Sequence, residues 1–374
     1  MEPGQGGADT FLLAPHSYTG AMRILLANPR GFCAGVHMAV DVVDLLLELC
    51  KDVPIYVYHE IVHNKHVVQR FVDRGAIFVE DLHDVPEGQI LVFSAHGVSP
   101  ATRELARARN LTAVDATCPL VTKVHSEAIR YARQGYQILL IGHADHQEVV
   151  GTRGEAPDAT QVVECPEDIA GLTIKDPNKL VYLTQTTLST DDAEVIIKAL
   201  KVAFPNIKEP PGSDICYATT NRQHAVRQIA PECDVVLVVG SKNSSNSVRL
   251  TEISENVGVS AHLLDDVREL RGDWFKGTPG EGRDAKVLLT AGASAPEDLV
   301  AEICRTLLAQ YGGQIEQRDI VNEDTEFGLP ATLKRLMREK GIDPEGRKIR
   351  VGNWSITEEA YGAVPLTVSA RSGV

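Results

Sequence analysis

The sequence lacks any apolar run that approaches the ~20 residues needed to cross a bilayer, and its N-terminus lacks a basic region followed by an apolar one. Both absences predict a cytoplasmic protein. Positive charge is also scarce, because 37 Lys and Arg stand against 51 Asp and Glu, for a formal net charge of -14. Nucleic acids and membrane surfaces are polyanions, so this balance argues against either as a partner. An anionic ligand would need a local pocket.

Cysteine pairs of the CxxC type are absent as well. The chain has seven cysteines, an odd number, spread over most of its length. In a chain expected in the cytoplasm they are poor candidates for a disulfide framework, and some of them are candidates for metal ligands. Cys50, Cys165, Cys233 and Cys304 are interpreted as small apolar residues.

The length of 374 residues exceeds the ~250 to 300 at which one hydrophobic core usually stops growing, so two or three domains are expected. Short apolar runs alternate with helical patterns such as Val36–Cys50, which is typical of a parallel α/β architecture. The predicted strands are Arg23–Ala27, Ile55–Tyr58, Ala76–Val79, Ile90–Phe93, Ala113–Val114, Gln137–Ile141, Leu180–Leu183, Val235–Val239 and Val287–Thr290.

Three cysteines share one sequence context, a loop just before a helical pattern. They are Cys33 in GFCAG, Cys118 in DATCP and Cys216 in SDICYAT, which lie 85 and 98 residues apart. A polar loop follows each of them after 28 to 30 residues, and a second one after 63 to 78 residues, each behind a predicted strand. The first loops hold His63, His146 and Ser245, and the second loops hold His96, Thr186 and Ser294. The chain therefore looks like three related α/β units, whose nine loops are expected to converge beyond the carboxyl ends of the strands.

The chemistry of three such thiols differs from that of common metal sites. Zinc ribbons and ferredoxins take their ligands from short CxxC-type runs, which this chain does not have. A cubane cluster has four irons, so three cysteines leave one iron without a protein ligand. That iron can bind a substrate oxygen as a Lewis acid while the cluster supplies electrons. The sequence predicts one [4Fe-4S] cluster on Cys33, Cys118 and Cys216.

Eight motifs resemble, in the same order, those of the 4-hydroxy-3-methylbut-2-enyl diphosphate reductases, the last enzymes of the non-mevalonate isoprenoid pathway. They are RGFCAGV, VHN, SAHGVS, DATCPLV, GHxxHxEVxGT, TQTTLS, GSKNSSNS and TAGASAP, and they extend from about Met22 to Gln314. The resemblance implies three similar α/β domains in a pseudo-three-fold arrangement around a central iron-sulfur cluster. It also implies that Cys33, Cys118 and Cys216 are the cluster ligands.

The expected division of the chain follows from the repeat and the resemblance. A flexible N-terminal tail is expected at residues 1–21, and the first strand and cluster loop at 22–34 would complete the third domain. The three domains are expected at 35–117, 118–214 and 215–313. Residues 314–374 are expected to be an appended C-terminal extension with one helix at Pro330–Lys340.

The activity that the resemblance implies is the reductive dehydroxylation of (E)-4-hydroxy-3-methylbut-2-enyl diphosphate, an allylic diphosphate. The products would be isopentenyl and dimethylallyl diphosphate, and a ferredoxin or flavodoxin type protein is the expected electron donor. Imidazoles, hydroxyls and amides donate hydrogen bonds to phosphate oxygens, which suits a chain of negative charge. The implied diphosphate pocket consists of His63, His96, His146, Ser244, Ser245, Asn246 and Ser294.

Glu148 is the predicted catalytic acid. A carboxyl group enclosed beside a cluster and a diphosphate should have a raised pKa, so it can carry a proton to the leaving hydroxyl or the allyl anion. Thr186 is expected to position the substrate hydroxyl or to relay that proton, and His146 is counted among the catalytic residues. Members of the resembled family commonly read HPE where this chain has His146, Gln147 and Glu148. Without the fixed φ of proline, this loop is expected to be slightly looser.

Three other interpretations stay open at this point. A hydratase of the aconitase type would also use an open iron on three thiols, but it would not consume reductant. An electron carrier or cluster scaffold would not need nine convergent polar loops. A peroxide-sensing thiol protein would remain colourless when prepared without oxygen.

Overall fold

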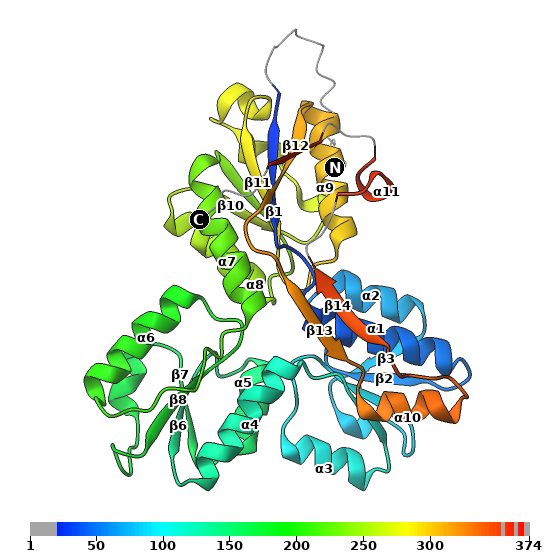
Figure 1. Ribbon diagram of the computed structural model, residues 1–374, viewed down its shortest axis with the longest axis vertical. Coiled ribbons are helices and arrows are strands. Elements are labelled where there is room, and N and C mark those ends of the chain that lie inside the picture. Colours follow the sequence, from blue (N-terminus) through cyan, green and yellow to red (C-terminus); the bar gives the residue numbers. More distant parts are fainter. Residues whose placement is uncertain (1–20, 353–355, 363–365, 370–374) are drawn as a thin grey trace, which may run out of the picture.

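A computed structural model describes residues 21–352, 356–362 and 366–369 of the chain. These residues form three α/β units, each with its own parallel sheet, arranged around a common centre (Figure 1). Apart from Ala21, the N-terminal tail expected at residues 1–21 lies outside the described residues. No helix of the described part of the chain is long and apolar enough to span a membrane.

The first unit has a four-stranded parallel sheet in the order β3-β2-β4-β5. Helix α1 packs one face on it, because Ala39, Val42, Val43 and Leu46 recur at helical spacing and are all fully buried. The elements of this unit are α1 (Ala34–Leu49), β2 (Ile55–Tyr58), α2 (Lys65–Asp73), β3 (Ala76–Val79), β4 (Ile90–Phe93), α3 (Pro100–Ala108) and β5 (Thr112–Asp115).

The second unit has a three-stranded parallel sheet in the order β7-β6-β8. All five residues of β8 are buried, as expected for a strand covered on both faces. Its elements are α4 (Pro119–Arg133), β6 (Gln137–Ile141), α5 (Gln147–Glu155), β7 (Thr160–Val163), β8 (Leu180–Thr184) and α6 (Thr190–Ala203).

The third unit has a six-stranded sheet in the order β10-β9-β11-β1-β12-β15, so the first strand of the chain lies in its middle. Strand β9 reads VVLVV and is completely buried, which is typical of a central parallel strand. The elements are β1 (Arg23–Asn28), α7 (Tyr217–Ile229), β9 (Val235–Val239), α8 (Ser245–Asn256), β10 (Ser260–Leu264), β11 (Lys286–Ala291), α9 (Glu297–Tyr311), β12 (Gln314–Asp319) and β15 (Leu366–Ser369).

The segment after Gly313 is not an appendage, so that expectation is wrong for the described residues. Strand β12 pairs with β1 along its whole length, and β15 extends the same sheet. Helix α10 (Ala331–Glu339) buries Leu333 and Met337 in the core of the first unit. The remaining elements are the antiparallel pair β13 (Asp324–Gly328) and β14 (Lys348–Gly352), and the short helix α11 (Glu358–Tyr361).

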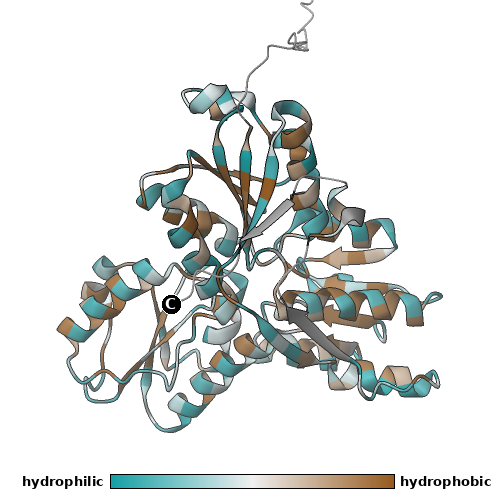
Figure 2. Cartoon of the chain, turned by 45° about the horizontal axis from the view of Figure 1, so that its top comes forward, coloured by the Kyte–Doolittle hydropathy of each residue, from teal (hydrophilic) through white to brown (hydrophobic). Residues whose placement is uncertain are grey.

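Hydrophobic residues account for this arrangement. Figure 2 shows hydrophobic colour concentrated on the central strands of the sheets and mixed colour along the helices, as expected when helices cover sheets with one face. The loops that follow the carboxyl ends of the strands lie at the centre of the molecule.

Candidate active site

One cavity of about 100 Å³ lies where loops of the three units meet. Because ~10 to 15 Å³ of such space already holds a water molecule, the cavity can take a ligand much larger than water. Among the described residues that line it, none is a lysine or an arginine. The lining includes all twelve residues singled out above: Cys33, His63, His96, Cys118, His146, Glu148, Thr186, Cys216, Ser244, Ser245, Asn246 and Ser294.

The three cysteines occupy the same position in the fold. Cys33, Cys118 and Cys216 are the residues that immediately precede the helices α1, α4 and α7. Their backbone N–H groups donate to carbonyl oxygens at matching places in the second polar loops of the repeat, at Ala293, Ala95 and Thr186, over 3.3, 3.0 and 3.0 Å. The repeat inferred from sequence offsets is therefore visible in the hydrogen bonds.

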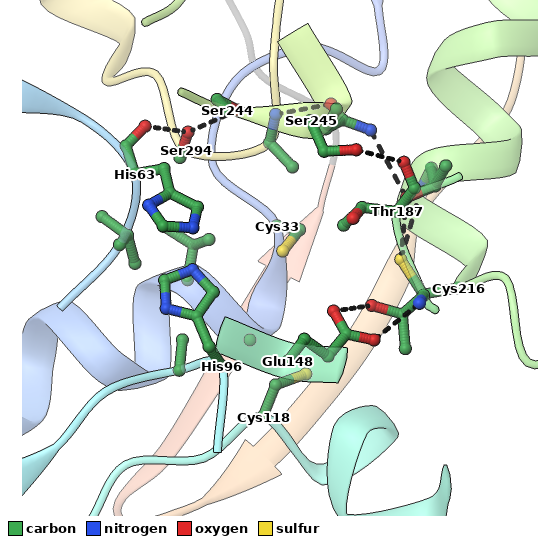
Figure 3. Close-up of a pocket in the computed structure, with 18 of the residues that line it drawn as sticks. Cys33, His63, His96, Cys118, Glu148, Thr187, Cys216, Ser244, Ser245 and Ser294 are labelled. Carbon is green, nitrogen blue, oxygen red and sulfur yellow. Dashed lines mark hydrogen bonds between the residues drawn. The ribbon is translucent and has the colours of Figure 1, made fainter. Parts of the chain in front are cut away.

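The space beside Gly35 shows how closely the sulfurs of Cys118 and Cys33 approach each other. A Cβ atom at this position would lie 2.5 Å from Sγ of Cys118 and 3.9 Å from Sγ of Cys33. Only glycine leaves room for the Cys118 thiol here, while the Cys33 sulfur lies within ordinary van der Waals contact of the same point. The structure thus brings together cysteines that lie 85 residues apart in the chain, and Figure 3 shows Cys216 facing the same pocket.

The electrostatics of the thiols indicate what they can hold. Burial raises the pKa of Cys216 to about 11, with a further contribution from Cys33, and burial also raises the pKa values of Cys33 and Cys118. Three thiolates therefore form here only beside strong positive charge, such as that of bound metal ions. Among the described residues, no three Cys, His, Asp or Glu side chains are close enough to hold a single metal ion. Cysteine thiolates are the usual ligands of iron-sulfur clusters, and three of them face this cavity, so the donor set fits such a group.

Glu148 is the only carboxyl group among the described lining residues, and it is 3% exposed. Its Oε1 accepts a hydrogen bond of 2.6 Å from the backbone N–H of Thr186, and its Oε2 accepts one of 2.9 Å from the Thr186 hydroxyl. Burial raises the pKa of Glu148 to about 7, although the two bonds from Thr186 act in the opposite direction. A group with this pKa can both give and take a proton near neutral pH.

Three imidazole rings form a cluster in the pocket, and Figure 3 shows two of them, His63 and His96, on the opposite side from Cys216. The rings of His63 and His96 are stacked at 4.0 Å, and His146 lies 5.3 Å from His63. Burial lowers the pKa of His146 to about 3 and that of His96 well below its usual value, with His63 adding to both effects. In an empty pocket His96 and His146 are therefore neutral.

Hydrogen bonds to the backbone and to a carboxylate fix the roles of two ring nitrogens. Nδ1 of His146 accepts a bond of 3.1 Å from the backbone N–H of Glu148, so Nε2 of the neutral ring carries the proton and is a donor. Nδ1 of His63 lies 3.1 Å from Oε2 of Glu60, a carboxylate whose pKa is lowered by that bond. His63 is thus paired with a negative charge from outside the cavity lining.

Serine and asparagine side chains complete the wall at the N-terminus of α8, whose cap is Ser244. Ser245 donates to the carbonyl of Thr187 over 3.0 Å, and Ser294 donates to the carbonyl of His63 over 2.9 Å. Asn246 accepts a bond of 2.9 Å from the N–H of Ala293. The free N–H groups at a helix N-terminus favour anions, so this end of the pocket suits a phosphate group.

Two lining residues with polar side chains escaped the sequence analysis. Thr187 follows Thr186 and holds Ser245 through its carbonyl. Thr219 lies three residues after Cys216, and its hydroxyl is 3.2 Å from the sulfur and 3.4 Å from Nδ2 of Asn246. Its position in the first turn of α7 was a usable signal, because such a residue faces the preceding cap. The structure also places Gln147 as the first residue of α5 and not in a loop.

Comparisons of the sequence and the structure with known proteins identify relatives of this chain. The sequence profile of the LytB protein family matches residues 24–308. Proteins named 4-hydroxy-3-methylbut-2-enyl diphosphate reductase are 51% identical in Nocardia farcinica, over 85% of this chain and 93% of the relative, and 50% identical in Rhodopirellula baltica, over 85% and 98%. The solved structure of the E-1-hydroxy-2-methyl-but-2-enyl-4-diphosphate reductase from Plasmodium falciparum is similar with a TM-score of 0.82 at 42% identity, over 86% of this chain and 99% of that one. A structure described as the terminal enzyme of the non-mevalonate pathway aligns with a TM-score of 0.55 at 30% identity, over 77% and 99%.

Proposed function

The chain belongs to the LytB family of 4-hydroxy-3-methylbut-2-enyl diphosphate reductases, and from that premise we propose how its own residues carry out the reaction. The substrate is (E)-4-hydroxy-3-methylbut-2-enyl diphosphate. Two electrons and two protons enter, the allylic C–O bond breaks, a C–H bond forms and water leaves. The products are isopentenyl and dimethylallyl diphosphate. The observation that carries the proposal is three equivalent cysteines facing one cavity that also holds an acid and neutral hydrogen-bond donors.

The cofactor of the proposal is a [4Fe-4S] cluster held by Cys33, Cys118 and Cys216. When bound, such a cluster supplies the electrons, and three cysteine ligands leave one of its irons open to the substrate. The helix N-termini behind the three sulfurs favour thiolates, since the positive end of each helix dipole points at them. Gly35 leaves the room that the Cys118 sulfur needs next to Cys33.

The diphosphate binds on the opposite side, at His63, His96, His146, Ser244, Ser245, Asn246 and Ser294. These groups donate hydrogen bonds without adding fixed positive charge, which also allows the diphosphate product to leave. A bound diphosphate brings negative charge close to the imidazoles of His96 and His146, so it favours their protonation against the effect of burial. Glu60 lies 3.1 Å from Nδ1 of His63 and so orients this third ring.

Glu148 carries the proton. With a pKa of about 7, a large share of this carboxyl group is protonated at neutral pH. The hydroxyl of Thr186 lies 2.9 Å from Oε2 and lines the same cavity, so it can position the substrate hydroxyl and pass the proton on. His146 fixes the first turn of α5, where Glu148 lies, through its bond to the Glu148 N–H. This geometry directs the proton to the C–O bond that breaks.

The electrons must come from a protein partner, and a ferredoxin or flavodoxin type donor is part of the proposal. A cytoplasmic location is also part of it. All seven cysteines are unpaired, which suits a compartment that keeps thiols reduced.

The test is anaerobic purification followed by turnover. The protein should be brown, hold about four irons per chain, and consume the hydroxymethylbutenyl diphosphate in proportion to dithionite supplied through a mediator. Substrate loss without use of reductant would favour a hydratase. A brown protein that leaves the diphosphate untouched would favour a carrier, and a colourless protein a thiol sensor.

A further inference from the structure

A fully buried arginine joins two of the cysteine segments. Arg222 of α7 donates to the carbonyl oxygen of Gly31 twice, from one terminal nitrogen over 2.6 Å and from Nε over 3.2 Å. Its other terminal nitrogen donates to the carbonyl of Ala218 over 3.0 Å. Gly31 lies two residues before Cys33, and Ala218 lies two residues after Cys216. Ala218 belongs to the first turn of α7 itself, so the guanidinium group ties the Cys33 loop to the start of the helix that Cys216 precedes.

The counter-charge comes from the C-terminal part of the chain. Oε1 of Glu323 lies 3.1 Å from Arg222, and the two side chains are 2% and 0% exposed. The same oxygen accepts a bond of 3.1 Å from Asn221. Glu323 immediately precedes β13, beyond residue 308 where the family profile ends. In Figure 1 the orange strand β13 leads away from the centre of the molecule, where α7 begins.

Stability alone does not explain this pair. A buried ion pair loses so much hydration that replacing it by apolar side chains is often neutral or stabilising. What such a pair provides is a fixed geometry and a fixed electric field in a medium of low dielectric constant. Here the geometry is that of the Cys33 loop, and the field acts next to Cys33.

We propose that Arg222 and Glu323 are positioning residues that hold the Cys33 loop against the cluster and set the reduction potential of that cluster. The proposal rests on the proposed function, because it requires a cluster on Cys33, Cys118 and Cys216. A reduced cluster carries one more negative charge, so a nearby cation favours reduction and a nearby anion opposes it. Arg222 is the closer of the two charges, since it contacts the Cys33 loop directly.

The experiment compares three variants with a matched control, all as full chains loaded with iron and sulfide without oxygen. Arg222→Gln should lower the midpoint potential, and Glu323→Gln should raise it. Arg222→Lys should keep a potential close to that of the unmodified protein. Both changes of Arg222 should increase the rate at which a chelator removes iron, by roughly 10- to 100-fold, as for other partners of metal ligands. Glu316→Gln is the control, because it removes a mostly buried carboxylate of the same segment that pairs with Arg23 and Arg318 and not with the Cys33 loop.

Opposite shifts for the Arg222 and Glu323 variants are the decisive result, because a purely structural role would change iron content without reversing the sign of the shift. Equal potentials in all variants, or shifts of the same sign, would overturn the proposal. If Arg222→Gln does not fold, the other two variants still test the proposal. Arg222→Lys tests the loop through the rate of iron removal, and Glu323→Gln tests the electric field through the midpoint potential. Failure of the unmodified chain to bind iron would instead overturn the proposed function.

Discussion

The two sides of the pocket differ in the sign of the charge that burial suppresses. We call Cys33, Cys118, Cys216, Glu148 and Thr186 the acid side, and His63, His96, His146, Ser244, Ser245, Asn246 and Ser294 the donor side. On the acid side burial raises pKa values, to about 7 for Glu148 and about 11 for Cys216. On the donor side it lowers them, to about 3 for His146. One enclosed space thus keeps acids protonated and bases neutral.

This pocket therefore suits ligands of opposite charge. In the proposed function, metal cations on the acid side would offset the cost of forming thiolates, and an anion on the donor side would offset the cost of forming imidazolium ions. A pocket with permanent charges would bind one of these ligands tightly and repel the other. Changes on the acid side should therefore affect the cluster or the chemical step, while changes on the donor side should affect binding of the diphosphate.

The largest effect is expected when an acid-side thiol is removed. Cys118→Ala should abolish iron binding and turnover together, because two thiolates do not hold a cubane cluster at this site. Iron and sulfide analysis after anaerobic loading measures it. Cys165→Ala is a matched control, since Cys165 also precedes a helix, the short 3-10 helix Pro166–Gly171, yet does not line the cavity. Normal iron content in the Cys118 variant would remove the basis for the cluster site.

Glu148→Gln should affect chemistry without affecting the cluster. Glutamine keeps the shape of the side chain but carries no transferable proton, so kcat should fall by about 10²- to 10⁴-fold at unchanged iron content. Steady-state kinetics with dithionite and a mediator provide the measurement. Glu127→Gln changes a buried carboxyl group of α4 that does not line the cavity, and it should leave kcat nearly unchanged. A fully active Glu148 variant would assign the proton to another group.

The sequence could predict this site because its polar residues follow contiguous apolar strands at repeated offsets. Parallel sheets place such loops at one edge, so the convergence followed from the pattern once the repeat was found. The rest depended on pairing between distant segments. Strand β12 reads QIEQRD, and nothing in this polar run signals a strand beside β1, where Glu316 is buried against Arg23. The pair of Arg222 and Glu323, 101 residues apart in the chain, was equally invisible.

On the donor side, His96→Gln should raise KM more than it lowers kcat. A hydrogen bond to a charged group contributes about 1.5 to 3 kcal/mol, which corresponds to roughly 10- to 100-fold in affinity. His63 would also lose the stacked ring of His96, whose centroid lies 4.0 Å from its own. Substrate titration of the iron-loaded protein separates KM from kcat. His83→Gln changes an exposed histidine outside the cavity lining and is the control. A loss confined to kcat would contradict the division of the pocket into two sides.

The pH dependence of kcat should follow the protonation of Glu148, which lies on the acid side. Glu148 acts as an acid, so kcat should be highest below its pKa of about 7 and fall by about tenfold for each pH unit above it. The two bonds from Thr186 stabilise the ionised carboxylate and therefore lower this pKa. Thr186→Val removes the hydroxyl bond, so the falling limb should move to higher pH even though kcat is lower. If the falling part of the pH profile stayed at the same pH, the Thr186 hydroxyl would have no influence on the pKa of Glu148.

The smallest effect is expected at Gln147, next to both sides of the pocket. The resembled family commonly has proline there, and its loss was expected to loosen a loop. Gln147 is instead the first residue of α5, a position where proline is favoured because its N–H has no partner within the helix. Gln147→Pro should therefore stabilise the protein by about 0.4 to 1 kcal/mol through the unfolded state, which raises Tm by roughly 0.5 to 1.3 °C. Thermal unfolding of the iron-loaded protein measures it, with Gln147→Ala as the control that lacks the ring. A decrease in Tm for proline would mean that the Gln147 side chain itself supports the helix that carries Glu148.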